Sequence, residues 1–206
     1  MEDFIFSSKV VYENLDTLKS TYPFIQVGST GKSVLGNDIP YVRIGRGQKE
    51  VFYSAAIHAN EWITSIILLE FMHEYCSAIQ NNSTIWSFSA RRLFDSVSIY
   101  IMPIVNPDGV DLVTGAISTS SVSYKEAQQI ANNFSNIPFV DGWKANIRGV
   151  DLNLQFPAGW KNARDIKFAQ GFSKPAPRDF VGYGPLTDQK LLLFIISHYN
   201  ITLSLF

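Results

Sequence analysis

His58 and Glu61, a histidine and a carboxylate three positions apart, are the residues of this chain best suited by type and spacing to metal chemistry. An imidazole nitrogen and a carboxylate oxygen are both good zinc ligands. A catalytic zinc ion generally has three protein ligands and a bound water with a pKa of about 7, which becomes a nucleophile at neutral pH. The pair alone is a weak signal, because a glutamate also favours any ordinary helix N-terminus.

The elements expected around this pair strengthen the metal interpretation. A nearly apolar run over residues 51–57 predicts a buried strand that ends directly before His58. A helical pattern follows from Trp62 to about Ile79, and its inner side is expected to carry Ile63, Ile66, Ile67, Phe71 and Tyr75. A second buried strand, over 97–105, is followed by Asn106. Ligands bind beyond the carboxyl ends of the strands in α/β sheets, so we expect His58 and Asn106 at one functional edge.

The remaining patterns complete an α/β order. Residues 137–184 are dominated by Pro, Gly and Asn and predict a long, irregular functional loop region. Together the elements predict a single α/β domain over residues 1–206, with a mixed, largely parallel sheet and helices on both faces. The other expected elements are a helix over 8–21, a hairpin of extended runs over 24–27 and 39–44, helices over 123–133 and 186–199, and a strand over 201–206.

Composition excludes several classes of function. The chain has 206 residues, 46% of them hydrophobic and 17% charged, which is typical of a globular domain and not of a disordered one. A net charge of -1 gives no basic field for nucleic acid or an anionic membrane surface. The apolar runs are too short for a membrane span and no signal peptide is seen, so we expect a soluble, cytoplasmic protein. The single cysteine, Cys76, permits no internal disulfide, and we interpret it as a packed thiol.

Three segments occur here in the order seen in the zinc metallocarboxypeptidases (peptidase family M14), and the chain resembles that family over nearly its whole length. They are Ala55–Trp62 (AAIHANEW), Pro103–Gly109 (PIVNPDG) and Gly149–Asn153 (GVDLN). The segment 142–160 looks most like the bacterial branch of γ-D-glutamyl-L-diamino acid endopeptidases, which act on peptidoglycan peptides. The resemblance implies a zinc carboxypeptidase-like fold, a Zn²⁺ cofactor, and hydrolysis of a peptide or γ-D-glutamyl amide bond.

The same resemblance assigns roles to individual residues. It makes His58 and Glu61 zinc ligands, and it makes Asp151 the carboxylate that accepts a hydrogen bond from His58, a role that fixes the imidazole tautomer. Asn153 matches a substrate-binding asparagine of the family. Lys144 falls where the family usually has an arginine that stabilises the oxyanion, and a lysine supplies the charge without the planar fork.

Two neighbouring positions leave alternatives open. Arg148, four residues after Lys144, could share the oxyanion role, whereas both cations could equally be solvated loop charges; Asp151 could likewise be an ordinary turn aspartate. Leu154 stands where true carboxypeptidases commonly have an arginine that clamps the terminal carboxylate of the substrate. That departure weakens a simple C-terminal exopeptidase interpretation and fits the peptidoglycan-peptide branch better.

The resemblance also implies residues that we do not find. The family's third ligand, a histidine, and its catalytic glutamate would follow Phe206, and neither His73 nor His198 matches the missing ligand. We therefore expect a truncated catalytic domain without its C-terminal portion. The alternatives are a catalytically inactive fragment that retains at most peptide binding, and a partner-binding fold with no metal role. Residues 106–109 (NPDG) are expected to be a structural turn under the site.

Overall fold

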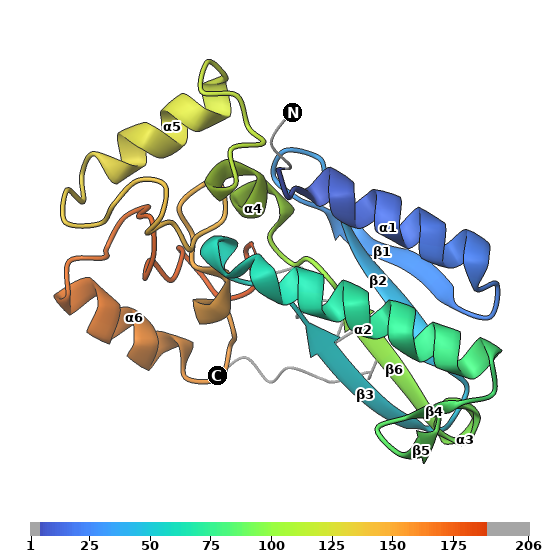
Figure 1. Cartoon of the computed structure of the whole chain (residues 1–206). Helices are drawn as coiled ribbons and strands as arrows, with labels where there is room; N and C mark the ends of the chain where they lie inside the picture. Colours follow the sequence, from blue (N-terminus) through green and yellow to red (C-terminus); the bar gives the residue numbers. More distant parts are fainter. Residues whose placement is uncertain (1–4, 189–206) are drawn as a thin grey trace.

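A computed structural model describes residues 5–188 and shows an α/β arrangement (Figure 1). The helices are α1 (Ser8–Thr21), α2 (Ile63–Gln80), α3 (Ala90–Ser96), α4 (Pro107–Val113), α5 (Val122–Ala131) and α6 (Trp160–Ala169), with short 3-10 helices η1 (Ala59–Glu61) and η2 (Leu152–Leu154). The strands are β1 (Gln26–Lys32), β2 (Asp38–Gly45), β3 (Lys49–Ser54), β4 (Thr84–Ile85), β5 (Phe88–Ser89) and β6 (Val97–Met102).

The main sheet has the strand order β1-β2-β6-β3, and β4 and β5 form a separate two-stranded sheet. The pairs β1–β2 and β2–β6 are antiparallel, whereas β3 and β6 run parallel with Ser54 opposite Met102. The expected α/β class with a mixed sheet is confirmed. Within residues 5–188, however, only one of the three pairings is parallel, so the expected predominance of parallel pairs is not seen there.

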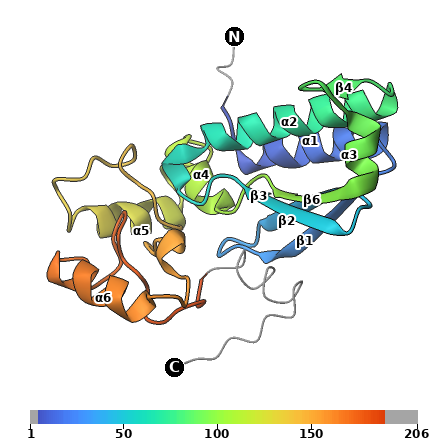
Figure 2. The same ribbon diagram turned by 90° about the horizontal axis from the view of Figure 1, so that it is seen from below.

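Helices α1 and α2 lie side by side on one face of this sheet (Figure 2). Leu18 of α1 and Met72 of α2 are both 0% exposed, as are Val42 of β2 and Ile101 of β6, and all four belong to one apolar cluster. Each such side chain stabilises the fold by about 1.5–3 kcal/mol through its removal from water. We expected helices on both faces; the two long helices of the described residues share one.

The inner side of α2 differs from the expected one. Ile63 and Ile67, which we placed on the inner side, are 53% and 61% exposed, whereas the neighbouring Leu69 and Cys76 are buried. The helix is apolar on nearly all sides, so the sequence pattern indicates a helix but does not indicate which side of it faces the sheet.

No helix in residues 5–188 is long and apolar enough to cross a membrane. Burial raises the pKa of Cys76 to about 12, which suits the packed thiol that we expected.

Strand β3 is shorter and more open than the buried strand predicted over 51–57. Val51 is 36% and Tyr53 47% exposed, because β3 is the last strand in the order formed by the described residues. Tyr53 packs edge-on against Phe71 of α2, and Trp86, 73% exposed, stacks on the same ring with 5.9 Å between centroids. These side chains form an open apolar surface beside β3.

Several other elements predicted from local sequence signals differ from the structure in their type or bounds. The expected turn at 106–109 is instead the beginning of α4, with the Asn106 side chain as N-cap and Pro107 in the first turn. Helix α5 begins after Ser121, whose hydroxyl caps it, and not at Ser123. Helix α6 lies inside the region expected to be irregular. Of the helix expected over 186–199, residues 186–188 are not helical; the rest of it, like the strand expected over 201–206, lies outside the described residues.

Candidate metal site

The carboxyl ends of the parallel strands β3 and β6 bring the site together. Beyond the strands, the backbone amides of Val105 and Asn106 donate to the carbonyls of Ala55 and Ala56, at 3.0 and 3.1 Å. Ala56 has a φ of 48°, in the left-handed region, and redirects the chain just before His58. The strand-to-helix change therefore presents His58 at the edge where we expected it.

Asn106 links the segment around Ala145 to this edge by hydrogen bonds. Its Nδ2 donates to the carbonyl oxygen of Ala145 at 2.9 Å and to that of Ile57 at 3.3 Å, while its Oδ1 caps α4. The amide of Ala59 donates to the carbonyl of Lys144 at 3.0 Å. Asn106 is 2% exposed, so these bonds are shielded from water. We had expected Asn106 at this edge, because it follows a buried strand, and in a structural turn; its hydrogen bonds to Ile57 and Ala145 were not predicted.

His58 lies between two carboxylates. Its Nδ1 is 3.1 Å from Oε1 of Glu61 and its Nε2 is 3.2 Å from Oδ1 of Asp151. The side chains of His58 and Asp151 are 16% and 6% exposed, whereas that of Glu61 is 48% exposed. Nε2 of His58 thus contacts the buried carboxylate of Asp151, and Nδ1 faces the more exposed carboxylate of Glu61.

The donor pair formed by His58 and Glu61 fits a zinc ion. Zinc binds imidazole nitrogen and carboxylate oxygen at about 2.0–2.2 Å, so two of its ligands can lie as close as Nδ1 and Oε1 do here. Asp151 contacts the other ring nitrogen, Nε2, as the carboxylate partners of zinc-bound histidines do. Within residues 5–188 there is no cluster of three or more His, Cys, Asp or Glu side chains able to hold a metal. The described residues therefore offer two candidate ligands, His58 and Glu61, and a carboxylate, Asp151, that contacts one of them.

Backbone amides fix Asp151 in turn. The amide of Asn153 donates to its Oδ1 at 3.2 Å and the amide of Asp179 donates to its Oδ2 at 3.1 Å. The backbone of Asp151 itself donates to the carbonyl of Phe180 at 2.8 Å. The carboxylate is thus tied both to η2, which follows it, and to the segment around Asp179.

These contacts shift the ionisation of all three side chains. The hydrogen bond that His58 donates to Asp151 raises the pKa of His58 above its usual 6.5, against a smaller opposing effect of burial. Burial alone would raise the pKa of Asp151, but the hydrogen bond and charge of His58 and the backbone amides hold it below its usual 3.8. Burial also acts to raise the pKa of Glu61, and His58 and Lys144 outweigh it, so that this pKa lies below 4.5. Both carboxylates are therefore anionic at neutral pH.

Lys144 and Asn153 lie beside this pair. The ammonium group of Lys144 is 3.2 Å from Oε1 of Glu61, and its side chain is 22% exposed. Lys144 and Asn153 line a pocket of about 160 Å³ together with His58, Asp151 and Leu154. The structure thus brings five of the six residues singled out from the sequence into one region; Glu61 joins through its contacts with His58 and Lys144.

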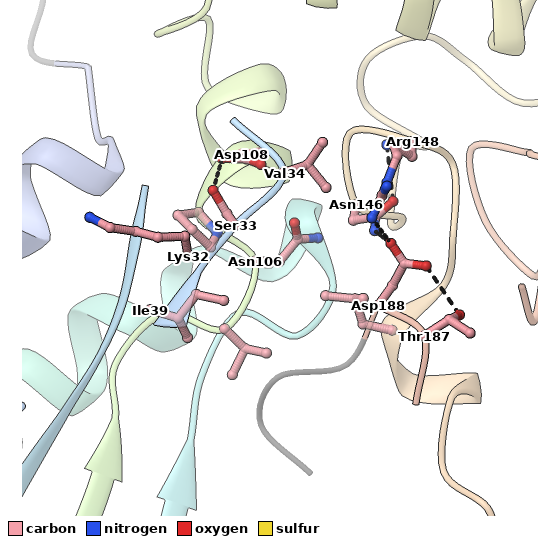
Figure 3. Close-up of a pocket in the computed structure, with 13 residues that line it drawn as sticks. Lys32, Ser33, Val34, Ile39, Asn106, Asp108, Asn146, Arg148, Thr187 and Asp188 are labelled. Atoms are coloured by element: carbon pink, nitrogen blue, oxygen red, sulfur yellow. Dashed lines mark hydrogen bonds and ion pairs between the residues drawn. The ribbon is translucent and has the colours of Figure 1, made fainter. Parts of the chain in front are cut away.

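Arg148 lies elsewhere. Its guanidinium pairs with the carboxylate of Asp188, to which Asn146 also donates, and the arginine side chain is 59% exposed. These residues line a second pocket of about 170 Å³, with the buried Asp108 also on its lining (Figure 3). The pocket beside His58 does not include Arg148.

Sequence comparison relates the chain to known proteins. The family model described as zinc carboxypeptidase matches residues 11–205. Gamma-D-glutamyl-L-diamino acid endopeptidase 1 of Lysinibacillus sphaericus is 38% identical over 89% of this chain and 44% of its own length. The uncharacterized protein YqgT of Bacillus subtilis is 37% identical over 89% of this chain and 48% of its own length. The chain thus spans somewhat less than half of either relative.

Solved structures give the same fold. Thrombin activatable fibrinolysis inhibitor matches with a TM-score of 0.69 and 18% identity, over 95% of this chain and 44% of the other. Carboxypeptidase A from Helicoverpa armigera matches with a TM-score of 0.65 and 22% identity, over 94% of this chain and 42% of the other. At these identities the similarity concerns the arrangement of helices and strands.

Proposed function

Because the chain belongs to the zinc carboxypeptidase family, we propose that it supplies two zinc ligands, His58 and Glu61, to a metallopeptidase that hydrolyses a peptide or γ-D-glutamyl amide bond. One observation carries the proposal: Nδ1 of His58 and Oε1 of Glu61 lie 3.1 Å apart at the carboxyl end of β3, while Asp151 holds Nε2. When bound, zinc activates water as a nucleophile and polarises the substrate carbonyl.

Asp151 prepares His58 for the metal. With the proton on Nε2, the imidazole donates to Asp151 and presents the lone pair of Nδ1 toward Glu61. The anionic carboxylate also makes the imidazole a stronger ligand. Because Asp151 is itself fixed by two backbone amides, the ring is oriented before any metal arrives.

Lys144 is the residue that we assign to the developing oxyanion. It lines the pocket beside His58 and carries its positive charge on a partly buried side chain, where electrostatic interactions are stronger than in water. Arg148 instead pairs with Asp188 at the second pocket, and we assign it no contact with the reacting atoms. The exposed amide side chain of Asn153 is available to hydrogen-bond the substrate backbone.

We propose γ-D-glutamyl-diamino acid amides, such as those of peptidoglycan peptides, as the substrate class. The support is the 38% identity to an endopeptidase that is named for that bond. Leu154, which lines the pocket, cannot clamp a terminal carboxylate, and this favours cleavage within a peptide over removal of its last residue.

Zinc titration of the purified chain tests the metal part of the proposal. We expect His58→Ala and Glu61→Gln to weaken zinc binding at least tenfold, because each removes one of two ligands. His73→Ala, a histidine of α2 outside the pocket, is the matched control and should leave the affinity unchanged. Equal zinc affinity in the wild-type chain and His58→Ala would contradict the assignment.

Hydrolysis of a γ-D-glutamyl-L-lysine peptide, followed by mass spectrometry with zinc or with chelator, tests the reaction. We expect cleavage of the γ-amide that depends on zinc and falls in Lys144→Ala. Zinc and peptide binding without cleavage would instead support the alternative of an inactive chain that retains peptide recognition.

A further inference from the structure

Two further cations line the pocket beside His58. Lys167 comes from α6 and Arg178 from the segment that follows this helix. The ammonium group of Lys167 is 2.6 Å from Oδ1 of Asp179, and Nε of Arg178 is 3.1 Å from Oδ2 of the same carboxylate. One carboxylate is therefore shared by two cations.

This arrangement leaves positive charge and hydrogen-bond donors available at the pocket. A guanidinium has five N–H donors, and the bonds of Arg178 found within residues 5–188 use Nε alone. The side chains of Lys167 and Arg178 are 26% and 39% exposed, so both are within reach of a ligand while partly withdrawn from water. With Lys144, whose ammonium group lies 3.2 Å from Oε1 of Glu61, the lining of the pocket carries three basic side chains and the carboxylates of Asp151 and Asp179.

The position of these cations is fixed relative to His58. Asp179 has a φ of 68°, and its amide donates to Oδ2 of Asp151, whose other oxygen contacts His58. The shared carboxylate thus belongs to the same hydrogen-bonded group that orients the imidazole. A ligand held by Arg178 would lie at a defined place beside the metal pair.

We propose that Lys167 and Arg178 form a subsite for a free carboxylate of the substrate, next to the scissile amide. The inference rests on the proposed function and deepens it by naming a chemical requirement of the substrate. A γ-D-glutamyl amide carries such a group beside the scissile bond: the α-carboxylate of the glutamyl residue, which stays free because the peptide continues through the γ-carboxyl group. Arg178 binds a carboxylate through its forked N–H groups, and Lys167 contributes charge.

The simpler alternative is that both cations only neutralise Asp179. The two roles predict different effects of substitution. A neutralising role makes Arg178→Gln alter the stability of the chain without altering its selectivity among peptides. A carboxylate subsite makes the same variant lose its preference for the charged peptide.

Binding of three probe peptides, measured by calorimetry in the presence of chelator so that no bond is hydrolysed, tests the subsite. The probes are N-acetyl-γ-D-glutamyl-L-lysine, its α-carboxamide, and its C-terminal amide. We expect the α-carboxamide to bind the wild-type chain about tenfold more weakly than the dicarboxylate, and the C-terminal amide to bind like the dicarboxylate. Arg178→Gln should bind all three with similar, weak affinity, and Arg178→Lys should lie between. Lys161→Gln, an exposed lysine of α6 outside the pocket, is the control.

The subsite is wrong if the α-carboxamide binds the wild-type chain as tightly as the dicarboxylate, if no probe binds, or if folded Arg178→Gln keeps the full preference. Thermal unfolding of each variant identifies a loss of fold. Because binding is measured without turnover, the two proposals fail separately. Charge-dependent binding without hydrolysis would support the subsite and contradict the proposed peptidase activity. Hydrolysis without selectivity among the probes would support the peptidase activity and contradict the subsite.

Discussion

Oδ1 of Asp151 lies 3.2 Å from Nε2 of His58, although 93 residues separate the two in the chain. This contact joins the end of β3 to the loop region that precedes α6, and the side chain of Asp151 is 6% exposed. An anion so buried is stable only because the imidazole and two backbone amides satisfy it. The pair therefore serves both the fold and the orientation of the candidate ligand.

Asp151→Asn tests that second role. An amide keeps the size of the side chain but neither its charge nor its full capacity to accept, so we expect zinc affinity to fall by about 10–100-fold. Competition with a chromophoric chelator measures the change. Asp165→Asn, an exposed aspartate of α6, should bind zinc like the wild-type chain. Unchanged affinity in Asp151→Asn would remove the supporting role.

The same pair predicts a pH window for the stability of the metal-free chain. The folded pKa of His58 lies above 6.5, so its contribution is complete below 6.5 and is lost as the pH rises through the folded value. The folded pKa of Asp151 lies below 3.8, so its contribution is present above 3.8 and is lost as the pH falls through the folded value. The difference in unfolding free energy between the wild-type chain and His58→Gln should thus be largest from 3.8 to 6.5.

Urea denaturation in the presence of chelator, at about pH 5 and about pH 8.5, measures this difference. We expect a smaller difference at the higher pH. A difference that grew with pH would mean that the imidazole is preferentially neutral in the folded state, contrary to the contacts that we describe.

Asn106→Asp distinguishes the two roles of Asn106: capping α4 through Oδ1 and donating from Nδ2 to the carbonyls of Ile57 and Ala145. Aspartate retains an acceptor for the amide of Gly109 but loses the donor to Ala145 and Ile57, and it places a charge beside their carbonyl oxygens. We expect a loss of about 1–3 kcal/mol in unfolding free energy. Zinc binding should also weaken, because the carbonyl of Ile57, next to His58, and that of Ala145 lose their shared donor. Asn132→Asp, at the end of α5, is the control.

Asp108→Ala tests a buried carboxylate that lies away from the metal pair. Asp108 is 2% exposed and accepts from the hydroxyl of Ser33, the amide of Leu35 and the side chain of Asn37 at 2.6–2.9 Å. Its removal leaves these donors without their acceptor, so we expect a loss of about 1–3 kcal/mol or more, measured by urea denaturation. Zinc affinity should not change. A substantial loss of zinc binding in a folded variant would show that this hydrogen-bond group reaches the site.

Much of the site could be predicted because its signals are local. A short apolar run before His58 gives a strand end, and the spacing to Glu61 places both side chains on the turn that follows. Asp151 required the resemblance to a family, since nothing in its immediate sequence indicates a partner 93 residues away. Asn106 was expected at this edge but in a turn, because an Asn-Pro sequence looks the same whether it begins a free turn or a capped helix.

The errors have physical causes. Helix α2 carries apolar residues on most of its surface, so the side facing the sheet is decided by packing against α1 and β2 and not by periodicity. Helix α6 has no buried residue and lies among Pro and Gly, so no apolar stripe marks it in the sequence. Lys167 and Arg178 meet at Asp179 only after α6 has formed and the chain has turned back. A pattern of single residues cannot indicate such a meeting.

The open rings beside β3 also have a consequence for handling the purified chain. Tyr53 and Trp86 keep 47% and 73% of their surface in contact with water, and transfer of such surface out of water becomes more favourable with kosmotropic salts. Ammonium sulfate should therefore drive copies of the chain together through this surface at concentrations that leave the sheet intact. The emission of Trp86, 73% exposed, would shift to the blue as this happens, against a background from the other three tryptophans, Trp62, Trp143 and Trp160.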